Sequence, residues 1–170
     1  MVAALDLTKM PELLGEDGKT LPQTEDKPSV ESPAFKKRMN LVWDAIVAND
    51  ASLAEQSFFP KQAYELVKDI EKPGADWKAR LLKLFARDVS TYHKQLGSEP
   101  KALTFLGVEI DEKRVKWIDR GKEGNKIGYH RVTRNKLRYR DPSGAERTLE
   151  LTSMISWRGE WFVVHLNGFK

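Results

Sequence analysis

Two long strand candidates, joined by a tight turn, constrain the fold of this chain most. From residue 103 the sequence changes to the two-residue period of β-strands, and residues 129–140 and 146–157 are the longest candidates. Asp141-Pro-Ser-Gly144 lies between them. Proline presets φ for a type I turn and glycine accepts a positive φ, so these four residues predict a hairpin. We therefore expect two long antiparallel strands.

Shorter strands on either side extend the predicted sheet. Residues 103–110 and 114–119 are strand candidates that precede the hairpin, and the three glycines of residues 120–128 indicate a loop. Residues 158–159 are Arg-Gly and predict a second tight turn before a last strand at 161–166. The C-terminal part of the chain therefore predicts an antiparallel meander.

The middle of the chain has the period of helices. Phe35, Met39, Val42 and Ile46 recur at spacings of four and three residues. Shorter predicted helices follow over 51–59 and 60–72. A long one is expected over 77–96, with Asp76 as its N-cap. Helices followed by a run of antiparallel strands is an α+β layout. We predict N-terminal helices packed on a bent, cone-like antiparallel sheet.

Residues 1–33 differ in composition from the rest of the chain. They contain four prolines and no aromatic residue, so they bury too little apolar surface to offset their ordering entropy. We predict an irregular N-terminal tail over 1–33 and a single α+β domain over 34–170. The leucines between Leu5 and Leu14 are the exception, because they could dock on the domain as one amphipathic turn.

The composition excludes several classes of site. The chain has no cysteine, which excludes disulfides, thiolate metal sites and a cysteine nucleophile. Its histidines, at 93, 130 and 165, lack the spacing of metal ligands, so we predict no metal and no cofactor. No apolar run is long enough to span a membrane. We expect a soluble protein, cytoplasmic unless an export signal before Met1 has been removed.

Three short stretches resemble one superfamily. Trp43-Asp-Ala-Ile-Val-Ala-Asn-Asp50 and Phe58-Phe59-Pro60 are similar to the first helix, the small-residue break and the aromatic-proline step of the nuclear transport factor 2-like (cystatin-like) superfamily. The closing residues 157–165 resemble its last hairpin. The resemblance covers residues 34–170. It implies helices in the hollow of a strongly bent sheet, with a cone-shaped pocket between them.

The resemblance leaves the activity open. The superfamily includes ketosteroid isomerases, dehydratases, transport factors and many pocket-bearing domains without chemistry. Fold alone therefore does not select a function, and the site residues must do so.

The candidate pocket residues come from two places in the chain. On strand 129–140 we expect the face with Arg131 and Asn135 to meet the helices, and the face with His130 and Val132 to meet water. A buried arginine needs an acceptor, and Asp88 or Glu150 could provide one. His165 could act as a general base or be a structural histidine at a strand end.

We therefore predict one set of ligand-binding side chains and no catalytic residue. The predicted pocket side chains are Asp88, Tyr92, Arg131, Asn135 and His165.

A basic stripe is the second candidate site. It consists of Arg134, Lys136, Arg138 and Arg140, whose side chains would project from one strand face about 7 Å apart, near phosphate spacing. Residues 101–170 carry 15 basic and 9 acidic side chains, so the positive charge of the protein is concentrated there. No aromatic ring interleaves the stripe on its own face. A solubilising outer face is the alternative interpretation.

These observations favour one function and leave two alternatives. We expect a non-catalytic domain that binds a small molecule or a protein partner through its cone. The first alternative is a small enzyme of the isomerase, dehydratase or hydrolase kind, with polar pocket residues as acid and base. The second is a binder of an anionic surface or nucleic acid, although we do not expect nucleic acid as the main partner. A homodimer through the sheet is left open.

Overall fold

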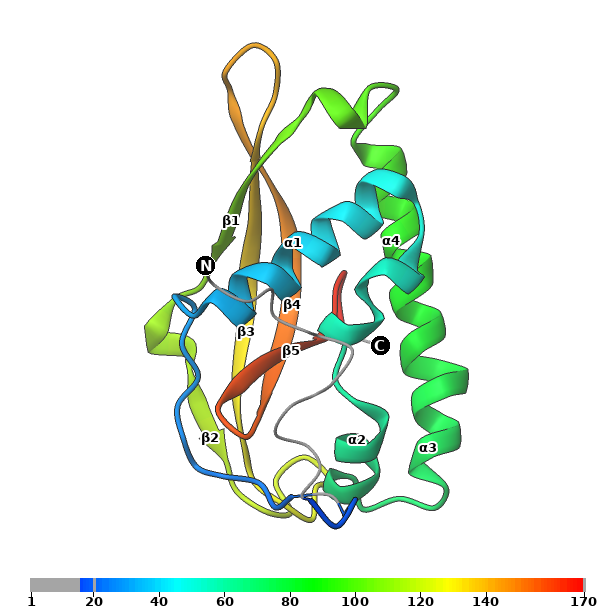
Figure 1. The fold of residues 1–170 in the computed structure, drawn as a ribbon, viewed down its shortest axis with the longest axis vertical. Helices are drawn as coiled ribbons and strands as arrows, with labels where there is room; N and C mark the ends of the chain where they lie inside the picture. Colours follow the sequence, from blue (N-terminus) through cyan, green and yellow to red (C-terminus); the bar gives the residue numbers. More distant parts are fainter. Residues whose placement is uncertain (1–15, 20, 170) are drawn as a thin grey trace.

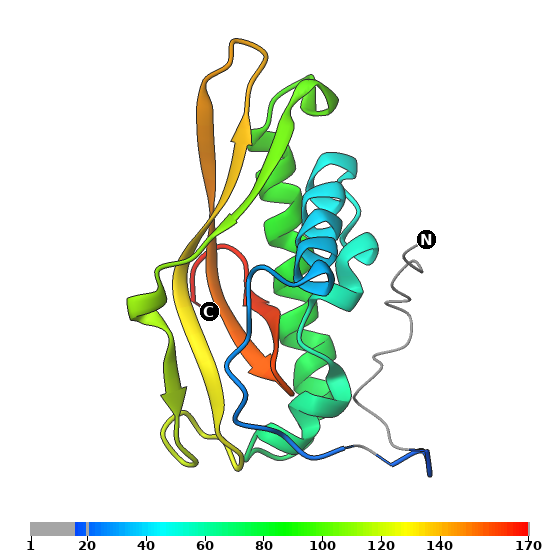
Figure 2. The same cartoon turned by 60° about the vertical axis from the view of Figure 1, so that its left-hand side comes forward.

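The fold is the predicted α+β arrangement, in which N-terminal helices cover one side of a strongly bent, cone-like antiparallel sheet. The structure is a computed structural model that describes residues 16–19 and 21–169. Figure 2 shows the helices and the sheet as two layers. The expected docking of Leu5–Leu14 lies outside the described residues.

Helix α1 begins and ends where its local sequence directs it. It spans Pro33–Ala48, and the Ser32 hydroxyl accepts a hydrogen bond from the backbone N–H of Phe35 at 3.1 Å. Proline at the first position suits a helix start because the missing N–H has no partner there. The helix ends at Asn49, whose φ of 52° is left-handed.

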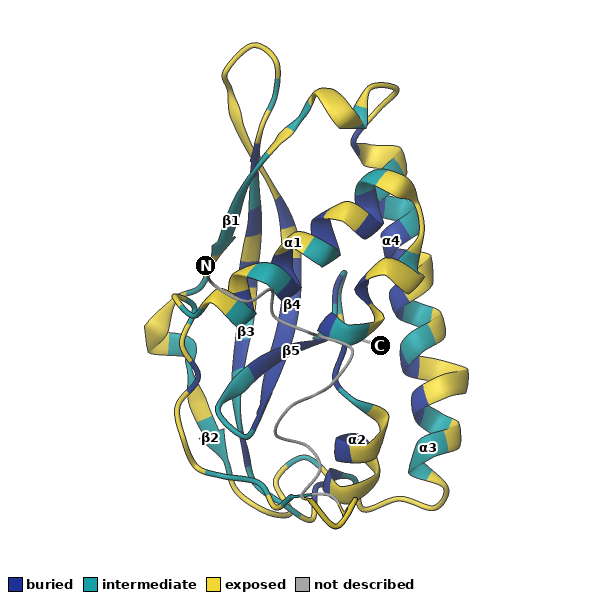
Figure 3. Ribbon diagram, in the orientation of Figure 1, coloured by how far each residue is buried: buried dark blue, intermediate teal, exposed yellow. Residues whose placement is uncertain are grey.

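The buried face of α1 packs against the sheet. The ring of Trp43 stacks on Phe105 with 5.3 Å between centroids, and it lies 5.2 Å from the ring of Tyr139. Figure 3 shows that the helices turn their exposed residues away from the sheet. This apolar face consists of Phe35, Met39, Val42, Trp43, Ala45 and Ile46.

After α1 come two short helical segments and then one long continuous helix, which lies beside the sheet (Figure 1). The two short segments are the 3-10 segment η1 (Ala51–Ser57) and helix α2 (Lys61–Val67). The long helical rod runs without interruption through α3 (Pro73–Asp76), the π-helical segment η2 (Trp77–Leu82) and α4 (Lys83–Gln95).

The start of this rod corrects one prediction. We expected the long helix to begin after an N-cap at Asp76, but it begins at Pro73. Asp76 has helical backbone angles and caps nothing, because its carboxylate binds the side chains of Tyr64 and Arg80. Pro73, which directly follows the helix predicted over 60–72, is instead the first residue of the next helix, a position that suits proline.

All strand pairs of the sheet are antiparallel. The path is β1-β3-β4-β5, and β2 pairs with β3 as well. Both predicted tight turns are present, between β3 and β4 and between β4 and β5. The strands are β1 (Thr104–Glu109), β2 (Lys116–Ile118), β3 (Tyr129–Arg140), β4 (Glu146–Trp157) and β5 (Glu160–His165).

The alternation of β3 breaks in the middle of the strand. Val132 is fully buried, although we expected it on the wet face, and the next buried residue is Asn135. This spacing of three residues spans Arg134, which has a left-handed φ of 59°. A non-glycine residue with positive φ is uncommon in a strand. The two-residue period of burial therefore holds only from Asn135 onward, because the buried residues Tyr129 and Val132 before Arg134 are also three positions apart.

Residues 21–32 contain no helix or strand, yet they lie against the sheet. The Gln23 amide donates to the carbonyls of Gly128 and Ser156 at 3.3 and 3.0 Å. Its oxygen accepts the backbone N–H of Arg158 at 2.7 Å. Pro28 is buried as well. Side-chain hydrogen bonds therefore attach this irregular segment to the domain.

Gln23→Ala tests the attachment. We expect it to lower the free energy of unfolding by about 2 kcal/mol, because three partly buried hydrogen bonds are lost and each is worth about 0.5–1.5 kcal/mol. For a chain of this size that corresponds to a fall in Tm of about 4–8 °C in a thermal melt. The exposed neighbour substitution Glu25→Ala should leave Tm unchanged, and equal shifts for both variants would contradict the assignment.

Candidate functional site

A cavity of about 210 Å³ lies between α2, the π-helical segment η2 and the sheet. Polar and charged groups converge on it from the helices, from the loop 119–128 and from β3. Leucine, isoleucine, valine and aromatic side chains complete its wall. Its lining residues are Tyr64, Lys68, Arg80, Leu81, Glu123, Tyr129, Arg131, Ser153, Ile155, Val164, His165 and Phe169.

On the helical side, Tyr64, Asp76 and Arg80 form one hydrogen-bonded cluster. The Tyr64 hydroxyl donates to Asp76 Oδ2 at 2.5 Å, and the Arg80 guanidinium donates to both carboxylate oxygens at 2.8 Å. The hydrogen bond from Arg80 holds the pKa of Asp76 below its usual range. Burial, reinforced by the bond to Asp76, raises the pKa of Tyr64. The phenol therefore stays protonated and acts as a donor.

On the sheet side, Tyr129, Glu123 and Arg131 form a cluster of the same chemistry. The Tyr129 hydroxyl donates to Glu123 Oε1 at 2.7 Å, and Arg131 forms an ion pair with Oε2. Burial is the main cause that raises the pKa of Tyr129, with the bond to Glu123 second. The two clusters thus each combine a carboxylate, an arginine and a tyrosine.

The partner of Arg131 corrects a prediction. We proposed Asp88 or Glu150 as the acceptor, but Glu123 fills this role. The sequence hides the pair because Glu123 belongs to the glycine-containing loop, which we interpreted as a plain connection. The side chain of Arg131 is also 29% exposed rather than fully buried. It lies at the wall of the cavity.

Asn125 positions the loop that carries Glu123. This side chain is only 2% exposed. Its amide group donates to the carbonyls of Asp119 and Ile127 at 3.2 and 2.9 Å, and its oxygen accepts the backbone N–H of Glu123 at 2.9 Å. One buried amide therefore closes the loop on itself. Two backbone hydrogen bonds fix the loop beside the cavity: the N–H of residue 69 donates to the carbonyl of residue 124, and the N–H of residue 126 donates to the carbonyl of residue 67.

Lys68 lies between the two clusters. Its ammonium group donates to the main-chain carbonyl of Glu123 at 3.3 Å. Burial lowers the pKa of Lys68, and the charge of Arg80 lowers it further, whereas Glu123 raises it. Within the part of the chain that the structure describes, no carboxylate oxygen lies within ion-pair distance of this ammonium.

The structure brings two of the five predicted pocket residues into this cavity. Arg131 and His165 line it, and the ring of His165 lies 5.4 Å from that of Phe169, in edge-to-face contact. Phe169 is 64% exposed and forms part of the same wall. Arg131 on β3 and His165 on β5 thus bring the third and last strands to one site.

The other three predicted residues do not line this cavity. Asp88 is buried and accepts the backbone N–H of Asn167 at 3.2 Å. The Tyr92 hydroxyl donates to the carbonyl of Glu150 at 2.7 Å. These contacts attach α4 to β4 and to the residues after β5, which is a structural role.

Asn135 is buried inside β3 and bonds its own strand. Its amide group donates to the carbonyl of Val132 at 3.3 Å, across the break in the alternation. Its side-chain oxygen has no hydrogen-bond partner among the described atoms. The contact therefore concerns the backbone of the strand and not the cavity.

The basic stripe is present but is mixed with carboxylates. Arg134, Lys136 and Arg140 are exposed, and Arg138 is partly buried. Arg138 pairs with Glu146 at 2.5 Å and with Glu109 at 3.8 Å. Lys136 has Glu109 and Glu150 as its partners across the two neighbouring strands. Acidic residues therefore neutralise part of the stripe.

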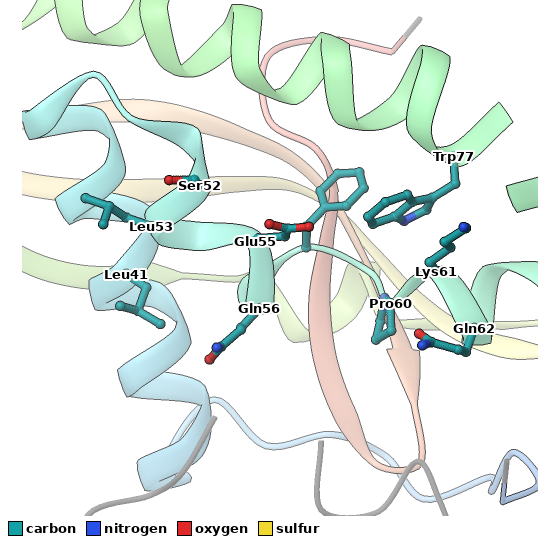
Figure 4. A pocket seen from close by; sticks show the side chains of 10 residues that line it. Leu41, Ser52, Leu53, Glu55, Gln56, Pro60, Lys61, Gln62 and Trp77 are labelled. Carbon is teal, nitrogen blue, oxygen red and sulfur yellow. The ribbon is translucent and has the colours of Figure 1, made fainter. Parts of the chain in front are cut away.

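A second, larger hollow of about 560 Å³ lies on the outer side of the helices. Figure 4 shows Leu41 and Leu53 on one side of it and Trp77 with Pro60 on the other. Trp77 is fixed because its indole N–H donates to the carbonyl of Phe59 at 2.6 Å. The polar side chains here are mostly exposed and do not form a bonded cluster. The smaller cavity is therefore the better candidate site.

The wall of the cavity also shows what sequence reasoning missed. Tyr64, Lys68 and Arg80 come from segments that we interpreted only by their apolar faces. The π-helical segment places Arg80 and Leu81 at the cavity, and such segments often occur at functional sites. Nothing in the local spacing predicted it.

The assignment of this site rests on its geometry, because neither a metal-ligand cluster among the described residues nor a match to another protein supports it. Among the described residues, no group of three or more His, Asp or Glu side chains could hold a metal ion. No helix in residues 16–19 and 21–169 is long and apolar enough to cross a membrane. No family model, curated protein or solved structure matches the chain.

Proposed function

We propose that this protein is a non-catalytic module that binds a small molecule in the cavity between α2, η2 and the sheet. The observation that carries the proposal is the convergence of two carboxylate–arginine–tyrosine clusters and one lysine on a partly apolar cavity. Ligand sites typically combine an apolar wall with a few placed polar groups. The likeness of the cone to nuclear transport factor 2-like domains is part of the same proposal.

The chemistry of the clusters favours binding over catalysis. A general base needs a free lone pair near the reacting atom and a pKa suited to the working pH. Asp76 and Glu123 each bind an arginine and a tyrosine, and the raised pKa values of Tyr64 and Tyr129 keep both phenols protonated. These groups suit recognition of a ligand. The enzyme alternative would assign a base role to His165.

Cavity-filling substitution tests the proposal. Ser153 is buried in the cavity wall, so Ser153→Leu should fill part of the space. We expect fragments that bind the wild-type protein in ligand-observed NMR to lose binding to this variant. Ser52→Leu is the matched control, because Ser52 is exposed and lines the outer hollow.

The outcomes separate the two hollows. Loss of binding in Ser52→Leu with retention in Ser153→Leu would move the site to the outer hollow. Retention in both variants, with their circular dichroism and melting curves close to wild type, would reject the cavity as a ligand site. Turnover of a bound fragment by wild type but not by His165→Gln would favour the enzyme alternative.

A further inference from the structure

We propose that the ligand of the cavity carries a single negative charge, a carboxylate on a small apolar body, and that Lys68 binds this group. The inference rests on the proposed function, because it names the class of molecule that the same cavity takes. It is carried by the charge arrangement around Lys68 and by the size and composition of the wall.

Among the described residues, the charges of the cavity leave one cation in excess. Arg80 is paired with Asp76, and Arg131 is paired with Glu123, so each guanidinium already has a carboxylate. Lys68 makes one long hydrogen bond, to a main-chain carbonyl. An ammonium group has three N–H donors. Two donors of Lys68 therefore stay available for a ligand within the described surroundings.

The position of Lys68 makes this excess charge costly unless an anion binds. The side chain is half-buried, and removing an ammonium group from water without a counter-ion is unfavourable. A bound carboxylate would supply the missing acceptor through charge-assisted hydrogen bonds, which are stronger than neutral ones. A neutral ligand would leave the ammonium as it is. The electrostatics of the site thus select for an anion.

The charge count also limits the ligand to one negative charge. A phosphate monoester brings close to two negative charges, and the two arginines could share the second only by giving up their own carboxylates. The opening of both ion pairs would cost the clusters their hydrogen bonds. A carboxylate matches the single excess charge without that cost.

The wall fits the rest of the molecule. Leu81, Ile155, Val164 and Phe169 present apolar surface in the same cavity. Its volume of about 210 Å³ is below the range of about 300–1,000 Å³ that is typical of sites for drug-sized ligands. The ligand is therefore a small acid with an apolar body.

Benzoate and benzamide provide a matched pair of probes, because they share shape and differ in charge. We expect benzoate to bind the full-length protein in titration calorimetry and benzamide to bind at least tenfold more weakly. Lys68→Met should weaken benzoate at least tenfold and leave benzamide unchanged. The control is Lys61→Met, which removes an exposed lysine from the start of α2, the helix that ends just before Lys68, and should change neither affinity.

A loss of structure in Lys68→Met would be visible in its melting curve, and Lys68→Arg then serves as the second variant. It keeps the positive charge, so benzoate should still bind more tightly than benzamide. Cyclohexanecarboxylate and its amide repeat the comparison with an aliphatic body.

Each remaining outcome decides between the inference and the proposed function. Equal affinity for acids and amides, with sensitivity to Ser153→Leu, would overturn the anion inference and keep the cavity as a binding site. If neither the two acids nor their amides bind while other fragments occupy the cavity, the anion inference is likewise overturned and the cavity remains a binding site. Tighter binding of inorganic phosphate than of benzoate would overturn the single-charge assignment. Absence of any cavity ligand would reject both.

Discussion

Glu160→Ala is expected to destabilise the protein by about 3 kcal/mol. Glu160 forms an ion pair with Arg38, which is 4% exposed and lies 4.7 Å above the ring of Phe162. Removal of one partner of a buried pair leaves an uncompensated charge and typically costs about 3–5 kcal/mol. We place the effect at the lower end because the Glu160 side chain is 36% exposed. Urea unfolding followed by circular dichroism measures it.

Arg38→Met is the matched partner of this experiment. It removes the buried cation itself, so we expect stability within about 1 kcal/mol of wild type, or higher. Burial lowers the pKa of Arg38 and Glu160 opposes this, which indicates that the charge is held at a cost. The Nε of Arg38 also lacks a hydrogen-bond partner among the described atoms. A wild-type midpoint for Glu160→Ala would show that Arg38 turns to solvent when its partner is removed.

The parts of the fold that sequence predicts well depend on local chemistry. The turn after β3 shows this, because Asp141 makes it within a few residues. Its carboxylate accepts from the N–H and hydroxyl of Ser143 and from Arg147. These bonds, that of the Ser143 side chain first, lower the pKa of Asp141 to about 2. Such contacts can be inferred from the sequence because they join residues that are close together in the chain, and the same holds for the cap of α1 by Ser32.

The start of the long helical rod was harder to predict because two local rules compete there. Lys72-Pro73-Gly74 reads as a helix stop, and Asp76 reads as an N-cap. Tertiary contacts decide the outcome: Tyr64 and Arg80 take the carboxylate of Asp76, and the helix begins at the proline. A cap assignment from sequence fails where the capping group has a better partner elsewhere in the fold.

The candidate site depends on contacts between residues far apart in the chain. Lys68 and the carbonyl of Glu123 are 55 residues apart, and no periodicity relates a helix end to a loop. Polar residues on expected inner faces, such as Asp88 and Asn135, were reasonable candidates for a pocket. The structure uses them to hold backbone groups instead. A buried polar residue thus indicates a hydrogen bond, and only the assembled fold shows whether the partner is a ligand.

Asn125→Ala is the second substitution with a large expected effect. Three hydrogen bonds of a buried side chain would be lost, at about 1 kcal/mol each, so we expect a loss of about 3 kcal/mol and a fall in Tm of about 6–12 °C. Asn40→Ala is the control, because Asn40 is exposed on α1, and it should stay within about 0.5 kcal/mol of wild type.

Asn125→Asp separates the two halves of the amide. It keeps the oxygen that accepts from the N–H of Glu123 but places a carboxylate oxygen against the carbonyls of Asp119 and Ile127. We therefore expect Asn125→Asp to be at least as destabilising as Asn125→Ala, because these two carbonyl oxygens would face a buried negative charge instead of an N–H donor. A variant with near wild-type stability would show that the acceptor alone holds the loop.

Asn125→Ala also tests how the loop 119–128 affects ligand binding in the cavity. In Asn125→Ala the loop 119–128 should exchange its amide hydrogens faster than in wild type, because the side chain that closes the loop is gone. Glu123 would then be held less firmly against Arg131, and a second cation would become available in the cavity beside Lys68. We expect benzoate to lose less affinity from Lys68→Met in this background than in wild type. An unchanged loss, together with unchanged exchange in the loop, would show that Glu123 is positioned by Tyr129 and Arg131 alone.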